Sequence, residues 1–186
     1  MTSSLRTLIL GGARSGKSAY AEQLVSASGK EVIYLATARA DDTEMTSRIA
    51  HHRAQRPADW RTIEEPLALG HALARWCAPQ RVVLIDCLTL WLSNLLFIDQ
   101  QTFPEVGAIT PPPCFYKQRD CFLNALEQAQ GDIILVSNEV GMGVVPLGAV
   151  SRWFADEAGR LNQAVAARCQ RAVLVAAGLP LVLKDG

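Results

Sequence analysis

The chain has 186 residues, of which 49% are hydrophobic and 19% charged, a composition that favours one globular domain, 1–186. Its 18 Lys and Arg residues balance 18 Asp and Glu residues, so it lacks the basic surplus of most nucleic-acid-binding proteins. No segment reaches the roughly 18 to 20 apolar residues of a membrane span, and Arg6 before a short apolar run is no signal peptide. We therefore expect a cytoplasmic protein without nucleic-acid partners. Five cysteines without C-x-x-C spacing favour free thiols.

Apolar runs that do not alternate with polar residues predict strands buried on both faces of a sheet. They lie at 7–10, 31–35, 81–85, 132–136 and 171–176. Stretches with helical periodicity separate them, at 18–28, 42–55, 67–77, 88–97, 117–130 and 150–169. This alternation predicts an α/β fold, a mostly parallel sheet with helices on both faces. The four prolines of 99–115 exclude a regular helix or central strand there and indicate a long surface loop.

Residues 11–18, GGARSGKS, fit G-x-x-x-x-G-K-[ST], the pattern of a phosphate-binding loop or P-loop. Glycines allow several backbone N–H groups to converge on one phosphate, and the following helix adds its dipole. Lys17 can reach the terminal phosphates, and the Ser18 hydroxyl can ligate Mg²⁺. An apolar run before the loop and a predicted helix after it provide the expected context. We predict that the phosphates contact Gly11, Gly12, Ala13, Arg14, Ser15, Gly16, Lys17 and Ser18.

Two acids follow apolar runs. Asp86 ends one of them and is predicted to hold Mg²⁺ directly or through water, as the acid on a neighbouring strand does in P-loop proteins; the alternative is that it only caps the next helix. Glu139 lies in a loop, 137–146, that contains two glycines and a proline. It could orient a substrate hydroxyl or a metal-bound water. It could instead cap a helix or form an ion pair, for example with Arg152 or Arg160, and the sequence leaves these alternatives open.

Two adjacent histidines lie in the predicted helix 42–55. Met45, Ile49 and His52 share one helical face, whereas His51 lies about 120° away from it. His52 is therefore the better candidate for a packed histidine and His51 for an accessible one. An imidazole is a competent nucleophile at neutral pH; the alternative for His51 is a solvated surface histidine.

Together these features resemble one family, the bifunctional adenosylcobinamide kinase/adenosylcobinamide-phosphate guanylyltransferases of cobalamin biosynthesis. Besides the P-loop, the matching motifs include R-I-x-H-H-[RK] at 48–53, N-L-L at 94–96, N-E-V-G-M-G at 138–143 and A-G-R-[LV]-N-Q at 158–163. The resemblance extends over nearly the whole chain and implies a RecA-like P-loop NTPase fold. Some family members have Glu where this chain has Asp86, and the segment 99–115 matches no family motif.

The resemblance implies two reactions. The first transfers a phosphoryl group from ATP or GTP to the hydroxyl of adenosylcobinamide. The second uses GTP to convert adenosylcobinamide phosphate to adenosylcobinamide-GDP, and pyrophosphate leaves. The resemblance also implies that His51 carries a covalent GMP in the second reaction and that Lys17 stabilises the leaving phosphates.

The resemblance extends the predicted site beyond the P-loop. It assigns to the nucleotide site Ala36, Thr37, Ala38, His52, Arg53, Ala54, Gln55, Glu64 and Asp86. It implies Mg²⁺ on Ser18 and Asp86 and a homo-oligomer, a trimer. Two other interpretations stay open: a P-loop kinase of small molecules without guanylyl transfer, and a GTP-dependent binding module.

Overall fold

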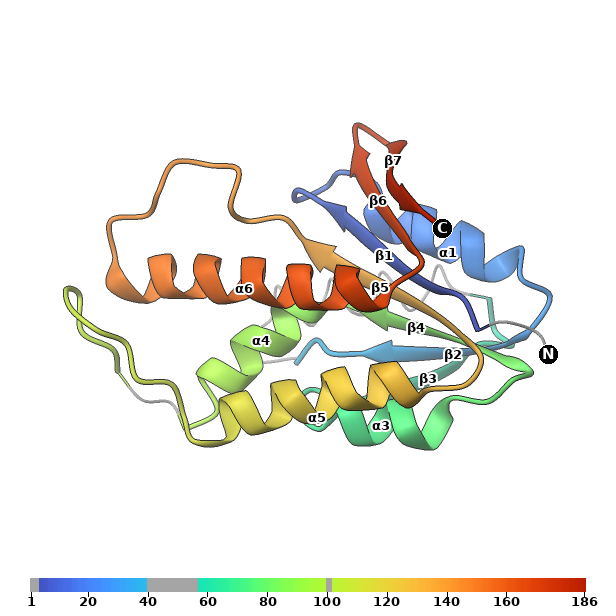
Figure 1. Ribbon diagram of the computed structural model, residues 1–186, viewed down its shortest axis with the longest axis horizontal. Coiled ribbons are helices and arrows are strands. Elements are labelled where there is room, and N and C mark those ends of the chain that lie inside the picture. Colours follow the sequence, from blue (N-terminus) through green and yellow to red (C-terminus); the bar gives the residue numbers. More distant parts are fainter. Residues whose placement is uncertain (1–3, 40–56, 100–101) are drawn as a thin grey trace.

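The computed structural model describes residues 4–39, 57–99 and 102–186. Its strands form one seven-stranded sheet in the order β3-β2-β4-β5-β1-β6-β7 (Figure 1). The strands are β1 (Arg6–Gly11), β2 (Glu31–Ala36), β3 (Arg61–Glu64), β4 (Arg81–Asp86), β5 (Asp132–Asn138), β6 (Arg171–Ala176) and β7 (Leu179–Asp185). The helices are α1 (Lys17–Ser26), α3 (Leu69–Trp76), α4 (Leu88–Leu96), α5 (Cys114–Gln128) and α6 (Ala149–Arg168). Neighbouring strands are parallel except β6 and β7, which are antiparallel.

Helices cover both faces of this sheet. On one face, α1 packs Ala21 and Val25 against strand residues that include Ile9. On the other face lie α3, α4, α5 and α6 (Figure 1), where the rings of Trp91 and Phe122 meet edge to face with centroids 5.0 Å apart. The predicted fold class, a mostly parallel α/β sheet with helices on both faces, is confirmed.

The unbroken apolar runs of the strands follow from this layering. Successive side chains of a strand point to opposite faces, and here each face is buried. Leu8 and Ile33 belong to the core under α3 to α6, whereas their neighbours Ile9 and Tyr34 belong to the core under α1. A strand that is buried on both sides needs apolar residues at every position, which is why no alternation was visible in the sequence.

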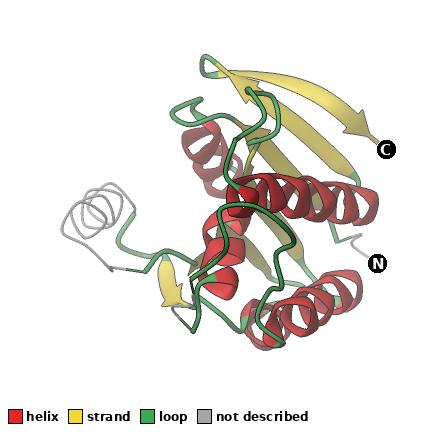
Figure 2. Cartoon of the chain, turned by 90° about the vertical axis from the view of Figure 1, so that its left-hand side faces the viewer, coloured by secondary structure: helices red, strands yellow, loops and turns green. Residues whose placement is uncertain are grey.

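Each of the five predicted strands occurs within two residues of its expected bounds, but β3 and β7 are absent from the prediction. β3 has only four residues and none of them is buried. β7 is exposed along its whole length and contains Pro180, a residue that argues against a central strand. It is the edge strand that ends at the C-terminus (Figures 1 and 2). Neither strand shows the buried apolar run on which the prediction depended.

The helix at 117–130 begins three residues earlier than expected, at Cys114. The Phe115 N–H donates to the Pro112 carbonyl at 2.9 Å, so the end of the proline run forms the first turn of α5, where a missing N–H costs nothing. The described residues of 99–113 form no helix or strand, in line with the predicted loop. The predicted helix 42–55 lies outside the described residues.

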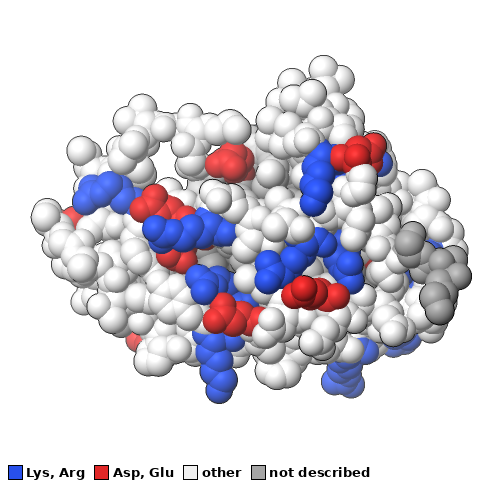
Figure 3. Space-filling model, viewed as in Figure 1, with Lys and Arg blue, Asp and Glu red and all other residues white. Residues whose placement is uncertain are grey.

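On the face shown in Figure 3, Lys and Arg side chains are interspersed with Asp and Glu. Large apolar side chains are exposed mainly in two segments, which we call the apolar loop (140–147) and β7. They are Val140, Met142, Val144, Val145 and Leu147 in the apolar loop and Leu179, Leu181, Val182 and Leu183 in β7. No helix of the described parts is long and apolar enough to cross a membrane. All five cysteines are free thiols, as expected.

Candidate nucleotide site at the carboxyl edge of the sheet

The strand register brings several predicted site residues to one edge of the sheet. Gly11 pairs with Asn138, and Ala36 pairs with both Glu64 and Asp86. These residues end five parallel strands, and ligands of open α/β sheets bind at that edge. β5 lies between β1 and β4, so the axes of the P-loop strand and the Asp86 strand are about 10 Å apart.

The P-loop joins β1 to α1 through two residues with left-handed backbone conformations. Gly16 has φ 93° immediately before α1, and Arg14 has φ 55°; such positive values favour glycine. Lys17 is only 9% exposed, and its Nζ donates a hydrogen bond to the Gly12 carbonyl at 3.1 Å. The ammonium group therefore folds back over the loop, beside the start of α1, where a bound phosphate would also meet the helix dipole.

Two other segments brace the P-loop. The Gly178 N–H, in the turn between β6 and β7, donates to the Ser15 carbonyl at 2.8 Å, and the Glu139 N–H donates to the Gly11 carbonyl at 3.0 Å. The β6–β7 turn also packs closely, because a Cβ added to Gly16 would lie 3.0 Å from the Gly178 Cα. These contacts fix the shape of the loop, and a fixed set of N–H donors favours binding of anionic groups.

Ser18 and Asp86 supply oxygens that suit Mg²⁺. Ser18 is a half-buried residue of the first turn of α1. The Oδ2 of Asp86 accepts a hydrogen bond from the Tyr34 hydroxyl at 3.1 Å, and a carboxylate has further lone pairs on both oxygens. Hydroxyl and carboxylate oxygens are hard ligands of the kind that Mg²⁺ uses together with substrate phosphates and water. The two residues therefore fit the ion.

Thr37 links the segment after β2 to the end of β4. Its side chain is 0% exposed, and its Oγ1 accepts a hydrogen bond from the Cys87 N–H and donates one to the Cys87 carbonyl, both at 2.8 Å. A contact from this segment to a nucleotide would therefore come from the backbone or from the half-buried Ala36 and Ala38. Burial, and next the charge of Asp86, raise the pKa of the Cys87 thiol, so this cysteine is a neutral packing group at pH 7.

Glu139 makes its contact within its own loop, where Oε1 accepts a hydrogen bond from the Gly141 N–H at 2.8 Å. Arg160 pairs instead with Glu157, and Arg152 donates to two carbonyls of the apolar loop. Among the described residues neither arginine pairs with Glu139. The expected ion pair of Glu139 with Arg152 or Arg160 is therefore wrong. The carboxylate shapes the loop that braces the P-loop.

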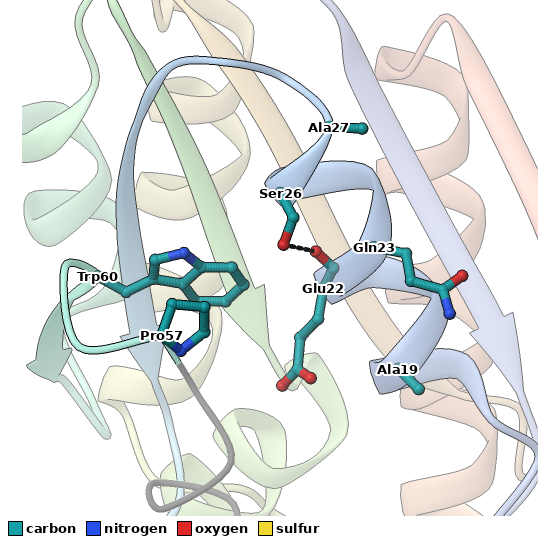
Figure 4. A pocket seen from close by; sticks show the side chains of 7 residues that line it. All are labelled: Ala19, Glu22, Gln23, Ser26, Ala27, Pro57 and Trp60. Atoms are coloured by element: carbon teal, nitrogen blue, oxygen red, sulfur yellow. Dashed lines mark hydrogen bonds between the residues drawn. The ribbon is translucent and has the colours of Figure 1, made fainter.

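A groove of about 630 Å³ runs along α1 (Figure 4). It is lined by Ala19, Glu22, Gln23, Ser26, Ala27, Pro57 and Trp60. The Trp60 ring stacks against Tyr34, with centroids 6.5 Å apart, and so connects the groove to the residue that contacts Asp86. The segment directly before Pro57 contains predicted site residues that lie outside the described residues, namely His51, His52, Arg53, Ala54 and Gln55.

Sequence reasoning missed two asparagines that donate hydrogen bonds to loops at this edge. Asn94 of α4 donates to the carbonyls of Thr37 at 2.7 Å and Pro66 at 3.1 Å. Asn162 of α6 donates to the Asn138 carbonyl at 3.4 Å. These asparagines lie within motifs that match the family, but nothing in their spacing indicates that they contact backbone groups of distant loops.

Solved structures share the fold. The ATPase EscN of the enteropathogenic E. coli type III secretion system aligns with a TM-score of 0.57 and 11% identity over 94% of this chain and 43% of its own. A second ATPase, described as prototypical for the type III secretion system of pathogenic bacteria, aligns with a TM-score of 0.53 and 12% identity over 96% of this chain and 56% of its own. At these identities the likeness shows the fold alone, that of P-loop NTPases.

Curated proteins are more similar to this chain in sequence than these solved structures are. The bifunctional adenosylcobalamin biosynthesis protein CobP of Pseudomonas aeruginosa is 53% identical over 97% of this chain and 98% of its own. The proteins named CobU of Escherichia coli and Salmonella typhimurium are 38% and 37% identical, each over 95% of this chain and 98% of their own. The model of the cobinamide kinase / cobinamide phosphate guanyltransferase family matches residues 7–183. The chain therefore belongs to this family of bifunctional enzymes.

Proposed function

We propose that the protein carries out both reactions of its family with nucleotides whose phosphates lie in the P-loop. It phosphorylates adenosylcobinamide with ATP or GTP and then transfers GMP from GTP to adenosylcobinamide phosphate. The observation that carries the proposal is the braced P-loop, with Lys17 over it, at the same sheet edge as Asp86, in a chain that belongs to the family.

The P-loop residues serve both reactions by stabilising negative charge. Backbone N–H groups of 11–18 and the Lys17 ammonium stabilise the phosphate oxygens as a P–O bond breaks. Ser18 and Asp86 would hold Mg²⁺, which would supply positive charge to neutralise the phosphates. In the kinase step, the substrate hydroxyl attacks the terminal phosphorus in line and a nucleoside diphosphate leaves.

The guanylyl transfer proceeds in two displacements. An imidazole nitrogen of His51 attacks the α-phosphorus of GTP, so that a P–N bond forms and the bond to pyrophosphate breaks. A phosphate oxygen of adenosylcobinamide phosphate then attacks the same phosphorus, which releases the histidine and gives adenosylcobinamide-GDP. This role of His51 rests on the family motif at 48–53. The nucleotide site in this proposal also includes the residues 36–38, 52–55 and Glu64.

The proposal extends to location and assembly. Both reactions consume nucleoside triphosphates, so we assign the enzyme to the cytoplasm. We also propose a homo-oligomer, a trimer as in the family resemblance. Its support on the described surface is β7, an edge strand with four exposed apolar side chains.

The test is to trap the covalent intermediate. Protein incubated with GTP labelled at the α-phosphate should acquire a label that acid removes, and mass spectrometry should find GMP on His51. His51→Ala should lose the label but keep the kinase reaction, whereas Lys17→Ala should lose both. His71→Ala, at an exposed histidine of α3, is the matched control and should label normally.

The outcomes separate the alternatives. If the unmodified protein phosphorylates adenosylcobinamide but takes up no label, or if His51→Ala labels normally, the covalent step is lost. The first result favours the kinase without guanylyl transfer. A protein that binds GTP but catalyses neither reaction would be a binding module.

A further inference from the structure

Asn94 joins two loops of the nucleotide site from below. It lies on α4, and its single side-chain NH₂ group donates to the Thr37 carbonyl, after β2, at 2.7 Å and to the Pro66 carbonyl, after β3, at 3.1 Å. An amide NH₂ has two hydrogens, so both are used. The two carbonyls belong to separate segments that reach the same sheet edge as Ala36 and Glu64.

Thr37 fixes the first of these loops to β4. Besides the two hydrogen bonds of its hydroxyl to the Cys87 backbone, its N–H donates to the Asp86 carbonyl at 3.2 Å. Asn94 and Thr37 together therefore tie the loop after β2 to the ends of both β3 and β4. These are the loops that contain the proposed nucleotide contacts 36–38, Glu64 and Asp86.

The P-loop is held by different contacts. Its braces come from Gly178 and Glu139, and among the described residues Asn94 makes no hydrogen bond to residues 11–18. Removal of the Asn94 amide would leave two carbonyls under the loops without this donor, while the P-loop would keep its braces. The loops after β2 and β3 and the P-loop are therefore supported by different contacts.

We propose that Asn94, supported by Thr37, is a positioning residue of the nucleotide site. It holds the loops after β2 and β3 in the arrangement in which residues 36–38 and Glu64 contact the same bound nucleotide. The inference rests on the proposed function, because that proposal assigns these segments to the nucleotide. It adds a residue that acts on the loops after β2 and β3 and not on the P-loop.

The test compares two ligands of the same protein. Both ligands are measured without Mg²⁺, so that Asp86 takes no part in phosphate binding. GTP would then contact both the P-loop and the loops after β2 and β3, whereas inorganic tripolyphosphate would contact only the P-loop. Asn94→Leu and Asn94→Asp, which remove the donor, should weaken GTP binding at least about tenfold, a loss of the size expected for hydrogen bonds of this kind. Tripolyphosphate affinity, measured by displacement of a fluorescent GTP analogue or by calorimetry, should stay within about twofold. An altered GTP KM should accompany the change in both reactions.

The control for Asn94 is its neighbour. Ser93→Ala changes a side chain that lines a different pocket, between α4 and the start of α6, and should bind both ligands normally. If the Asn94 variants do not fold, the pair Thr37→Val and Thr37→Ser replaces them. Val removes the hydroxyl and should weaken GTP alone, and Ser restores the hydroxyl and should recover most of the affinity.

Three results would overturn the inference: normal GTP binding by a folded Asn94→Leu protein, equal weakening of GTP and tripolyphosphate, or no GTP binding by the unmodified protein. The last result also overturns the proposed function. If the unmodified protein binds GTP but forms no GMP adduct, only the covalent step of the proposed function fails, and the binding comparison still decides the role of Asn94.

Discussion

Gly11 leaves no room for a side chain. A Cβ at this position would lie 2.4 Å from the Ser15 Oγ and 2.6 Å from the Val175 carbonyl oxygen, whereas a Cβ at Gly12 would have no atom within 4 Å. We expect Gly11→Ala to lower the free energy of unfolding by about 1 to 3 kcal/mol, because the P-loop must shift away from β6. Urea denaturation measures this change, and calorimetry with tripolyphosphate should show weaker binding.

Gly12→Ala is the matched control in the same loop. Its unfolding free energy should stay within about 0.5 kcal/mol of the parent protein. Equal stability losses at both positions would contradict the steric argument and point to a general intolerance of the loop to alanine.

A second prediction at the residue scale concerns Cys169, which is 2% exposed and whose pKa burial raises from 9.0 to about 12. Since the folded state favours the neutral thiol, this group stabilises the fold fully below pH 9 and loses that contribution as the pH rises towards 12. Above pH 9 the thiol should therefore lower the free energy of unfolding by about 1.4 kcal/mol per pH unit.

The comparison of the parent protein with Cys169→Ala isolates this effect. At pH 7.5 the parent should be more stable, because alanine leaves a small cavity. The difference in unfolding free energy should narrow by about 2 kcal/mol between pH 9 and pH 10.5. A difference that stays constant over this range, measured by urea denaturation, would show that the thiol does not titrate as stated.

At the same scale, the sequence predicted residues whose chemistry depends on local spacing. Lys17 and Ser18 follow from a loop pattern that contains its own geometry. Asn94 could not be predicted, because its partners are carbonyls 57 and 28 residues away in sequence and any carbonyl can accept a hydrogen bond. The hydrogen bonds of the Thr37 hydroxyl to the Cys87 backbone could not be predicted for the same reason, since Cys87 is 50 residues away in sequence.

Between helices, a close approach at a glycine joins α3 to α5. A Cβ at Gly70 would lie 2.8 Å from backbone atoms of Cys121 and Phe122. Gly70→Ala should therefore force the two helices apart and destabilise the fold by about 1 to 3 kcal/mol, despite the higher helix propensity of alanine. Chemical denaturation followed by circular dichroism measures the loss.

Gly159, in the middle of α6, provides the opposite case. No atom lies within 4 Å of a Cβ built there, so Gly159→Ala should stabilise the protein by about 0.5 to 1 kcal/mol through helix propensity. An equal free energy of unfolding for Gly70→Ala and Gly159→Ala would contradict the close packing of α3 against α5.

The success of prediction differed between elements for a physical reason. β1, β2, β4, β5 and β6 are buried on both faces, which forces a continuous apolar run. β3 and β7 lie at the sheet edges, where one or both faces are exposed and side chains are less constrained. Edge strands therefore leave weaker evidence in a single sequence.

For the whole molecule, the main question concerns β7, an edge strand whose large apolar side chains are exposed. Leu179, Leu181 and Leu183 alternate along it and are 72%, 59% and 56% exposed, and its outer edge has no further strand in the described sheet. Exposed apolar edge strands favour association. We expect Leu181→Glu together with Leu183→Glu to lower the mass in solution, measured by size-exclusion chromatography with light scattering.

The parent should have a mass of about 61 kDa, three times the 20.2 kDa subunit, if the proposed trimer forms. Val106→Glu, at an 83% exposed apolar residue of the loop before α5, is the control and should keep the mass of the parent. A monomeric parent at micromolar concentration, or an unchanged mass in the β7 variant, would remove β7 as an association surface.

The sequence by itself determined the α/β class, the P-loop and the family, because these depend on patterns between residues close along the chain. Burial on two faces produces apolar runs, and phosphate binding requires glycines, Lys17 and Ser18 within eight residues. Tertiary structure decided the strand order, the braces of the P-loop by Gly178 and Glu139, and the support of the loops after β2 and β3 by Asn94. These contacts join segments distant in sequence through backbone groups, and backbone groups are the same in every residue except proline.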